Sequence, residues 1–236
     1  MGRQCPLGGY VLYLDCLECD EKVCKKGKTI NKIVIGVDQS YADSGIAVVY
    51  NGLLAYVTES KSKSNANNTE RRKQLSEKLA AIFNKAIGKA ERFGNCEVVC
   101  IIERIRLQSA KPGEQHFLNI NYIKGIGALN AVIVDTANKY GIKVYSVDTR
   151  SWKSRVVGTS RPANNRYDFP SEKWPTIDWC IKKGYGKYIM EEVSPKKKKC
   201  VIEECGNRYT YNDNKADAIG IAMYGFVTGQ KLEEEQ

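Results

Sequence analysis

Three acidic residues lie in apolar segments that are far apart in the sequence. Asp38 lies within "IVIGVDQSYADSGIAVV", Glu103 ends "VVCIIE", and Asp217 lies within "KADAIGIA". A lone buried carboxylate is costly unless it is paired or bound to a metal. Together the three positions predict side chains that converge and share cations. Singly, Asp38 could cap a turn, Glu103 could pair with Arg104 or Arg106, and Asp217 could face solvent.

The ligand types indicate which cations such a site would hold. Carboxylate oxygens without nearby His or Cys select Mg²⁺ or Mn²⁺. Two such ions about 4 Å apart can bind both the attacking water and the leaving oxygen of a phosphodiester. The chain has a single histidine, His116, so a Ser-His-Asp triad or a His pair is very unlikely.

The segments that position these acids alternate between strand-like and helical patterns. This order predicts an α/β protein with an RNase H-like mixed sheet, in which an antiparallel meander joins parallel strands and helices cover both faces. We expect strands at 33–37, 45–50, 52–58, 97–105 and 143–148, and helices at about 70–92, with Thr69 as N-cap, and at about 116–140. Further helices are expected in "TRSWKSRVVG", "SEKWPTIDWCIKKGYG" and "NKADAIGIAMYGFVTG".

Residues 1–30 read as a separate Cys-rich module in front of the RNase H-like domain expected at 31–236. Cys5, Cys16, Cys19 and Cys24 have the spacing C-x10-C-x2-C-x4-C. Thiolates in a tetrahedral set suit structural Zn²⁺, and so short a segment cannot bury a core unaided. The alternative is a reduced arm that docks on the main domain through apolar residues.

A basic hairpin is expected as an insertion at about 187–211, around Ser194-Pro195. Its Lys196–Lys199 run could be a solvated tip or an arm that reaches backbone phosphate. Cys200 and Cys205 lack the two further ligands that a metal site would need.

The bulk composition limits the functional classes. Thirty-seven Lys and Arg against 27 Asp and Glu give a formal charge of +10, which makes a polyanionic partner plausible. No apolar run approaches the roughly 18 residues of a membrane span, and no signal peptide is evident. We therefore expect a cytoplasmic protein with no membrane partner.

Five segments of the chain follow one another in an order and spacing that are informative together. They are "IGVDQSYADSGIAVV", "CIIERIRL", "YSVDTRSWKSRVVG", "SEKWPTIDWCI" and "NKADAIGIAMYG". They resemble the successive blocks of RuvC-type Holliday-junction resolvases over about residues 31–230. The resemblance implies that Asp38, Glu103 and Asp217 are the catalytic carboxylates and that Lys153 and Lys173 lie beside the scissile backbone.

The sequence departs from the family pattern at two positions. An acid or histidine is expected three residues before Asp217, where this chain has Asn214; either Asp213 substitutes or Asn214 acts as a neutral ligand. Arg106 stands where the family often has a base-stacking aromatic. With Arg104 and Lys111, it makes this loop basic, which suits phosphate contacts.

The resemblance implies a metal-dependent endonuclease that resolves four-way DNA junctions by paired nicks in recombination or repair, acting as a homodimer. The alternatives are an RNase H-like nuclease for flaps, forks or RNA–DNA hybrids, a non-catalytic branched-DNA-binding module, and, least favoured, an actin-like or sugar-kinase ATPase. The size and the Cys-rich arm suggest a phage or mobile-element source.

Overall fold

The computed structural model describes most of the chain from residue 31 onwards. The described residues are 31–40, 43–62, 66–94, 96–104, 120–159, 161, 167–204, 206–227, 229 and 231–235, with the backbone of two short paired strands, β1 (Gly2–Gln4) and β2 (Tyr10–Leu12). The four cysteines expected to bind zinc lie outside the described residues, so the zinc module stays a prediction.

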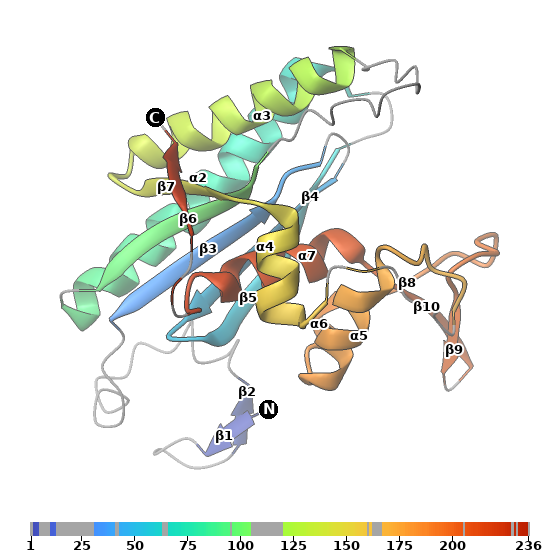
Figure 1. The fold of residues 1–236 in the computed structure, drawn as a ribbon. Helices are drawn as coiled ribbons and strands as arrows, with labels where there is room; N and C mark the ends of the chain where they lie inside the picture. Colours follow the sequence, from blue (N-terminus) through green and yellow to red (C-terminus); the bar gives the residue numbers. More distant parts are fainter. Residues whose placement is uncertain are drawn as a thin grey trace.

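A six-stranded mixed sheet forms the centre of the molecule, in the order β11-β7-β6-β3-β4-β5 (Figure 1). Strands β3, β4 and β5 form an antiparallel meander, and β6 and β7 run parallel to β3. This strand order is that of the RNase H-like fold and confirms the expected fold class. The strands are β3 (Lys32–Asp38), β4 (Asp43–Tyr50), β5 (Leu53–Lys61), β6 (Glu97–Glu103), β7 (Lys143–Val147) and the antiparallel edge strand β11 (Glu233–Glu235).

Helices cover both faces of this sheet, as expected. On one face lie α2 (Asn68–Phe93) and α3 (Ile120–Asn138); on the other lies α7 (Asp213–Tyr224), followed outward by α5 (Trp174–Lys182). Asn67, not Thr69, caps α2, because its side chain accepts from the Glu70 amide in a capping box. Among the described residues, no helix is both long and apolar enough to cross a membrane.

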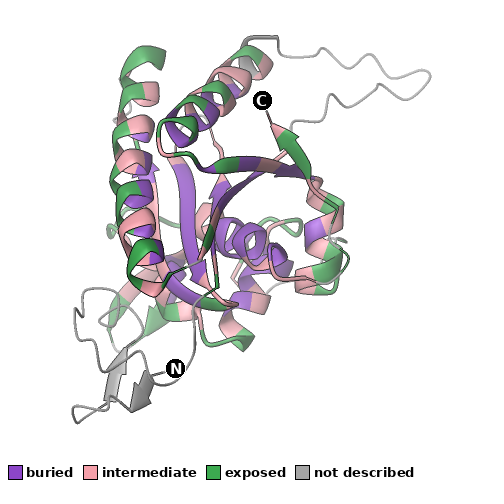
Figure 2. Ribbon diagram, turned by 90° about the vertical axis from the view of Figure 1, so that its left-hand side faces the viewer, coloured by how far each residue is buried: buried purple, intermediate pink, exposed green. Residues whose placement is uncertain are grey.

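Two hydrophobic cores result, one on each face of the sheet. Along β3, Ile33, Ile35 and Val37 belong to the core under α2 and α3, whereas Val34 belongs to the core under α7. This alternation is the two-residue period of a strand. Figure 2 shows the buried residues gathered in the central strands and in α7.

A short irregular helical stretch follows β7. It consists of α4 (Thr149–Trp152), which Asp148 caps by accepting from the Arg150 amide, and a π-helical turn, η2 (Lys153–Val157). Gly158 ends the stretch with a φ of 89°, a conformation that glycine adopts readily. The helix expected in "TRSWKSRVVG" is thus present, but its second half is wound more widely than an α-helix.

The segment at 187–211 begins in a short helix, α6 (Gly186–Ile189), and continues as a separate three-stranded antiparallel sheet. Its strands are β8 (Met190–Glu192), β9 (Ile202–Glu204) and β10 (Asn207–Tyr211), in the order β8-β10-β9. The strand that follows Ser194-Pro195 therefore does not return along β8, as a simple hairpin there would require; β10 pairs with both of its neighbours.

Candidate active site

Asp38 and Glu103 lie at the carboxyl ends of two neighbouring parallel strands. The register pairs Val37 of β3 with Ile102 of β6, so the next residues, Asp38 and Glu103, lie side by side. By the two-residue period both side chains belong to the face that α7 covers. The carboxyl ends of parallel strands are where α/β proteins commonly place their ligands.

Helix α7 approaches the sheet closely enough to bring a third carboxylate to the same place. A Cβ added to Gly36 of β3 would lie 2.4 Å from the Ala222 amide nitrogen, and one added to Gly45 of β4 would lie 2.0 Å from the Asn214 carbonyl oxygen. Only glycine permits these contacts. They set α7 directly against β3 and β4, and Asp217 on this helix is only 6% exposed.

The electrostatics show that the carboxylates share one environment. Burial, together with the charges of Asp217 and Glu103, raises the pKa of Asp38 well above its usual range. Burial likewise raises the pKa of Glu103, partly offset by the hydrogen bond from Trp152. Burial also raises the pKa of Asp217, although Lys153 and Lys173 oppose the shift. Such a cluster is typical of a functional site.

Two predicted lysines lie among these acids. Lys153 Nζ is 3.6 Å from Asp217 Oδ2, and Lys173 Nζ is 2.8 Å from Asp213 Oδ2. Burial alone would lower the pKa of Lys173, but the carboxylates of Asp217 and Asp213 outweigh it and raise that pKa, so the amine stays charged. Both ammonium groups partly neutralise the cluster.

Two residues that the sequence reasoning did not select hold Glu103 in place. Trp152, fully buried, donates from Nε1 to Glu103 Oε1 at 2.8 Å. The Gln39 side chain accepts from the Glu103 amide at 3.1 Å and donates to the Glu103 carbonyl oxygen. The only sequence signal for either was its position next to a selected residue, Lys153 or Asp38.

The structure distinguishes the two residues that could supply a further ligand on α7. Asp213 lies one helical turn before Asp217, pairs with Lys173, and adds to the charge that raises the pKa of Asp38. Asn214 instead donates from Nδ2 to the Asp43 carbonyl oxygen at 2.6 Å, at the start of β4. Asp213 therefore lies with the acids, and Asn214 anchors the helix.

The carboxylate oxygens of this site are the ligand type that hard divalent cations prefer, but they are not arranged around a single ion position. Within the part of the chain that the structure describes, Asp217 Oδ1 is buried and has no hydrogen-bond partner, so it has an unused acceptor that a cation could satisfy. Oxygen donors alone are what Mg²⁺ and Mn²⁺ prefer. Among the described residues, however, no three acidic, His or Cys side chains are placed to hold one metal ion.

The other residues that the sequence analysis singled out are not described as part of the acid cluster. Arg104 pairs with Glu233 of β11 at 2.5 Å, at the edge of the sheet. Arg106, Lys111 and Cys205 lie outside the described residues. Cys200 is described as a free cysteine.

Comparison with known proteins gives similarity only among solved structures. No family model matches the chain, and no curated protein sequence does. RuvC of Thermus thermophilus is similar at 16% identity and a TM-score of 0.48, over 82% of this chain and 93% of that one. T. thermophilus RuvC in complex with a Holliday junction substrate follows at 14% identity and 0.47, over the same shares.

A more distant similarity is to the ethanolamine utilization protein EutJ of Carboxydothermus hydrogenoformans, at 14% identity and a TM-score of 0.33, over 55% of this chain and 42% of that one. Similarity at these values supports no inference about activity. The fold assignment rests on the strand order of the chain itself.

Proposed function

We propose that this protein is a metal-dependent, structure-selective DNA endonuclease that resolves four-way junctions by paired nicks near the branch. The observation that supports it most is the cluster of Asp38, Glu103 and Asp217, which three different elements bring to one end of an RNase H-like sheet. The choice of a four-way junction rests on the resemblance of five sequence blocks to RuvC-type resolvases.

Asp38, Glu103, Asp213 and Asp217 would hold the divalent cations. When bound, Mg²⁺ or Mn²⁺ supplies Lewis acidity to the attacking water and to the leaving oxygen. Oxygen Oδ1 of Asp217 has no hydrogen-bond partner among the described residues, which supports this assignment, as does the unfavourable burial of Asp38 beside two other acids. Bringing the acids within ligand distance of one ion requires local adjustment of their side chains.

In this proposal Lys153 and Lys173 contact the DNA in addition to pairing with the acids. Lys153 and Lys173 are charged, lie at the edge of the acid cluster, and are 12% and 35% exposed in their side chains. When cations bind the acids, each ammonium group is free to contact a phosphate oxygen of the strand to be cut. There it would stabilise the charge that develops in the transition state.

Paired nicking of a junction requires two such sites, so the proposal includes a homodimer, since one chain carries one cluster. Symmetric dimers place two identical sites across a twofold axis, which matches the symmetry of a four-way junction. Sedimentation of the purified protein, alone and with junction DNA, tests this part.

The direct test is cleavage of a labelled synthetic four-way junction in Mg²⁺ or Mn²⁺, with linear duplex, flap and RNA–DNA hybrid substrates in parallel. Paired nicks near the branch, absent in Asp38→Asn, are expected. Equal or faster cutting of a flap or hybrid would assign the cluster to a different RNase H-like nuclease. Binding without any cleavage would indicate a non-catalytic junction-binding module.

A further inference from the structure

Four consecutive lysines lie in a loop of the three-stranded sheet β8-β10-β9, which we call the small sheet. We call residues 194–199 the lysine loop; it connects β8 to β9, and all six of its residues are exposed. Among the described residues, none of Lys196–Lys199 forms an ion pair. Two of the four acidic residues in the strands of this sheet are engaged elsewhere: Glu191 pairs with Lys215 at 2.5 Å, and Glu203 with Arg208 at 3.5 Å.

The backbone of the lysine loop is held in one shape. Lys197 donates its amide to the Ser194 carbonyl oxygen at 3.1 Å, which closes a turn. The Arg208 guanidinium of β10 then donates to the Pro195 carbonyl oxygen at 2.6 Å and to the Lys197 carbonyl oxygen at 2.9 Å. A merely solvated charge run needs no such bracing, whereas a binding loop gains affinity when it is ordered beforehand.

The end of the loop is also anchored. Cys200 adopts a left-handed backbone with a φ of 56°, which is unusual for a residue with a side chain. Its thiol donates to the Asp168 carbonyl oxygen at 3.3 Å, which joins the loop to the segment before α5. Strained positions persist where the surrounding contacts fix them.

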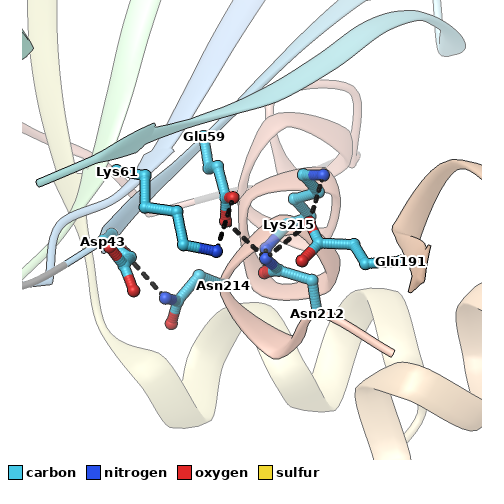
Figure 3. Close-up of polar contacts among 7 residues, drawn as sticks. All are labelled: Asp43, Glu59, Lys61, Glu191, Asn212, Asn214 and Lys215. Carbon is cyan, nitrogen blue, oxygen red and sulfur yellow. Dashed lines mark hydrogen bonds and ion pairs between the residues drawn. The ribbon is translucent and has the colours of Figure 1, made fainter. Parts of the chain in front are cut away.

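A polar cluster fixes the small sheet to the helix that carries Asp213 and Asp217 (Figure 3). Asn212, which directly follows β10, caps α7 by accepting from the Lys215 amide and donates to Glu59 of β5 and Glu191 of β8. Lysine pairing outweighs burial and lowers the pKa of Glu191, so this carboxylate stays charged. The position of the lysine loop is therefore fixed relative to the acid cluster.

We propose that the lysine loop binds the phosphate backbone of a DNA arm outside the site of cleavage. Lysine ammonium groups are compact point charges that suit phosphate without reading bases. Each neutralised phosphate releases counterions, which gives affinity that falls steeply with salt. The inference rests on the proposed function, because it takes the polyanion to be the same DNA that the acid cluster cuts.

The test compares two variants with the same change in charge. In one, Lys196, Lys197, Lys198 and Lys199 are replaced by Gln; in the other, four exposed lysines on the opposite face of the sheet are replaced by Gln. The control positions are Lys73, Lys85, Lys124 and Lys139. Binding of a fluorescent four-way junction is measured at several salt concentrations, and thermal unfolding verifies that both variants are folded.

In the loop variant we expect Kd at moderate salt to rise at least about tenfold. We also expect the slope of log Kd against log salt to fall by about 2–4, since each phosphate contact contributes about 0.9. The control variant should change much less. The single-turnover cleavage rate at saturating DNA should stay at the wild-type value, because the loop touches no reacting atom. Arg208→Gln, which keeps the lysines but removes the brace, should weaken binding by a smaller factor.

The outcomes separate the two proposals. Equal losses in the loop and control variants, or an unchanged salt slope in the loop variant, would overturn the role of the loop while leaving junction cleavage intact. A wild-type protein that neither binds nor cuts the junction would overturn the proposed function itself. A loop variant that binds normally but cuts slowly would also overturn the inference, since it would place the lysines in catalysis.

Discussion

The burial of the Asp38 carboxyl beside two other acids is expected to lower the stability of the folded protein at neutral pH. Its raised pKa means that the folded protein holds a proton there more tightly than the unfolded chain does. This group therefore favours folding below the unfolded pKa of about 3.9, and the contribution is lost as pH rises through the folded pKa. At neutral pH in chelator, Asp38→Asn should raise the free energy of unfolding by about 1–4 kcal/mol, and the gain should shrink toward acid.

Denaturant unfolding between about pH 4 and pH 8 measures this effect. Asp135→Asn, at an exposed position of α3, is the matched control and should change little. Added Mg²⁺ should raise the Tm of the wild-type protein but not that of Asp38→Asn, because binding to the folded state alone stabilises it. An Asp38→Asn variant that is less stable in chelator, or that responds fully to Mg²⁺, would contradict the assignment.

Asp213 and Asn214 make opposite predictions from adjacent positions. Asp213→Asn should lower the single-turnover cleavage rate by at least about 10–100-fold, since losing even a residue that only orients a metal ligand usually costs that much. Asn214→Ala should leave that rate near the wild-type value, because the Asn214 side chain donates to the Asp43 carbonyl oxygen of β4 rather than joining the acids. It should cost about 0.5–1.5 kcal/mol of stability. The reverse ranking of the two rates would make Asn214 the ligand.

At the scale of elements, local patterns predicted those parts whose burial follows a period. The apolar spacing of α2 and the β-branched run of β6 are examples, and both elements lie where expected. The prediction failed where tertiary contacts decide. Strand β5 continues to Lys61 through "ESK", which reads as loop, because β4 pairs with it along its length.

Edge strand β11 had no local signal at all. It consists of three glutamates, and it forms because its backbone pairs antiparallel with β7. The ion pairs Glu234–Lys143 and Glu233–Arg104 accompany this pairing across about 90–130 residues of sequence. The candidate site, too, could be predicted only in part. The apolar context of the acids was visible in the sequence. The contacts of Trp152 and Gln39 with Glu103 depend on how α4 and β3 pack, which the sequence pattern does not reveal.

The approach of α7 to β3 is the contact on which the acid cluster depends. Gly36→Ala should destabilise the protein by about 1–3 kcal/mol, because the new methyl would meet the backbone of α7 2.4 Å away. Gly88→Ala is the matched control: nothing lies within 4 Å of an added Cβ there, and alanine should stabilise α2 by about 0.5–1 kcal/mol.

Chemical denaturation of both variants, with cleavage assayed on the folded fraction, checks this prediction. If α7 moves to accommodate the methyl, cleavage should fall by more than the loss of folded protein explains, since Asp217 moves with the helix. A Gly36→Ala protein with wild-type stability and cleavage would show that the close approach is not required.

At the scale of the whole molecule, the two faces of the central sheet differ in the residues that they carry. The core under α2 and α3 contains no member of the acid cluster, whereas the face under α7 carries the acids, the two lysines and the attached small sheet. This division explains how a chain with a formal charge of +10 can concentrate carboxylates. Under the proposed function, the basic residues around them would attract DNA, and the acids would hold the cations that cutting requires.

The N-terminal cysteines should form a unit independent of that face. We expect purified protein to carry stoichiometric zinc that Cys16→Ser with Cys19→Ser removes, because two thiolates are too few to hold the ion. Cys96→Ser, at a half-buried free cysteine near β6, should retain the zinc.

Elemental analysis measures the zinc content, and junction cleavage in the same samples tests whether the zinc is needed for cutting. A zinc-free variant should still cut when Mg²⁺ is supplied, since the acids lie elsewhere in the sequence. Absence of zinc from the wild-type protein would leave the cysteines as thiols of a docking arm.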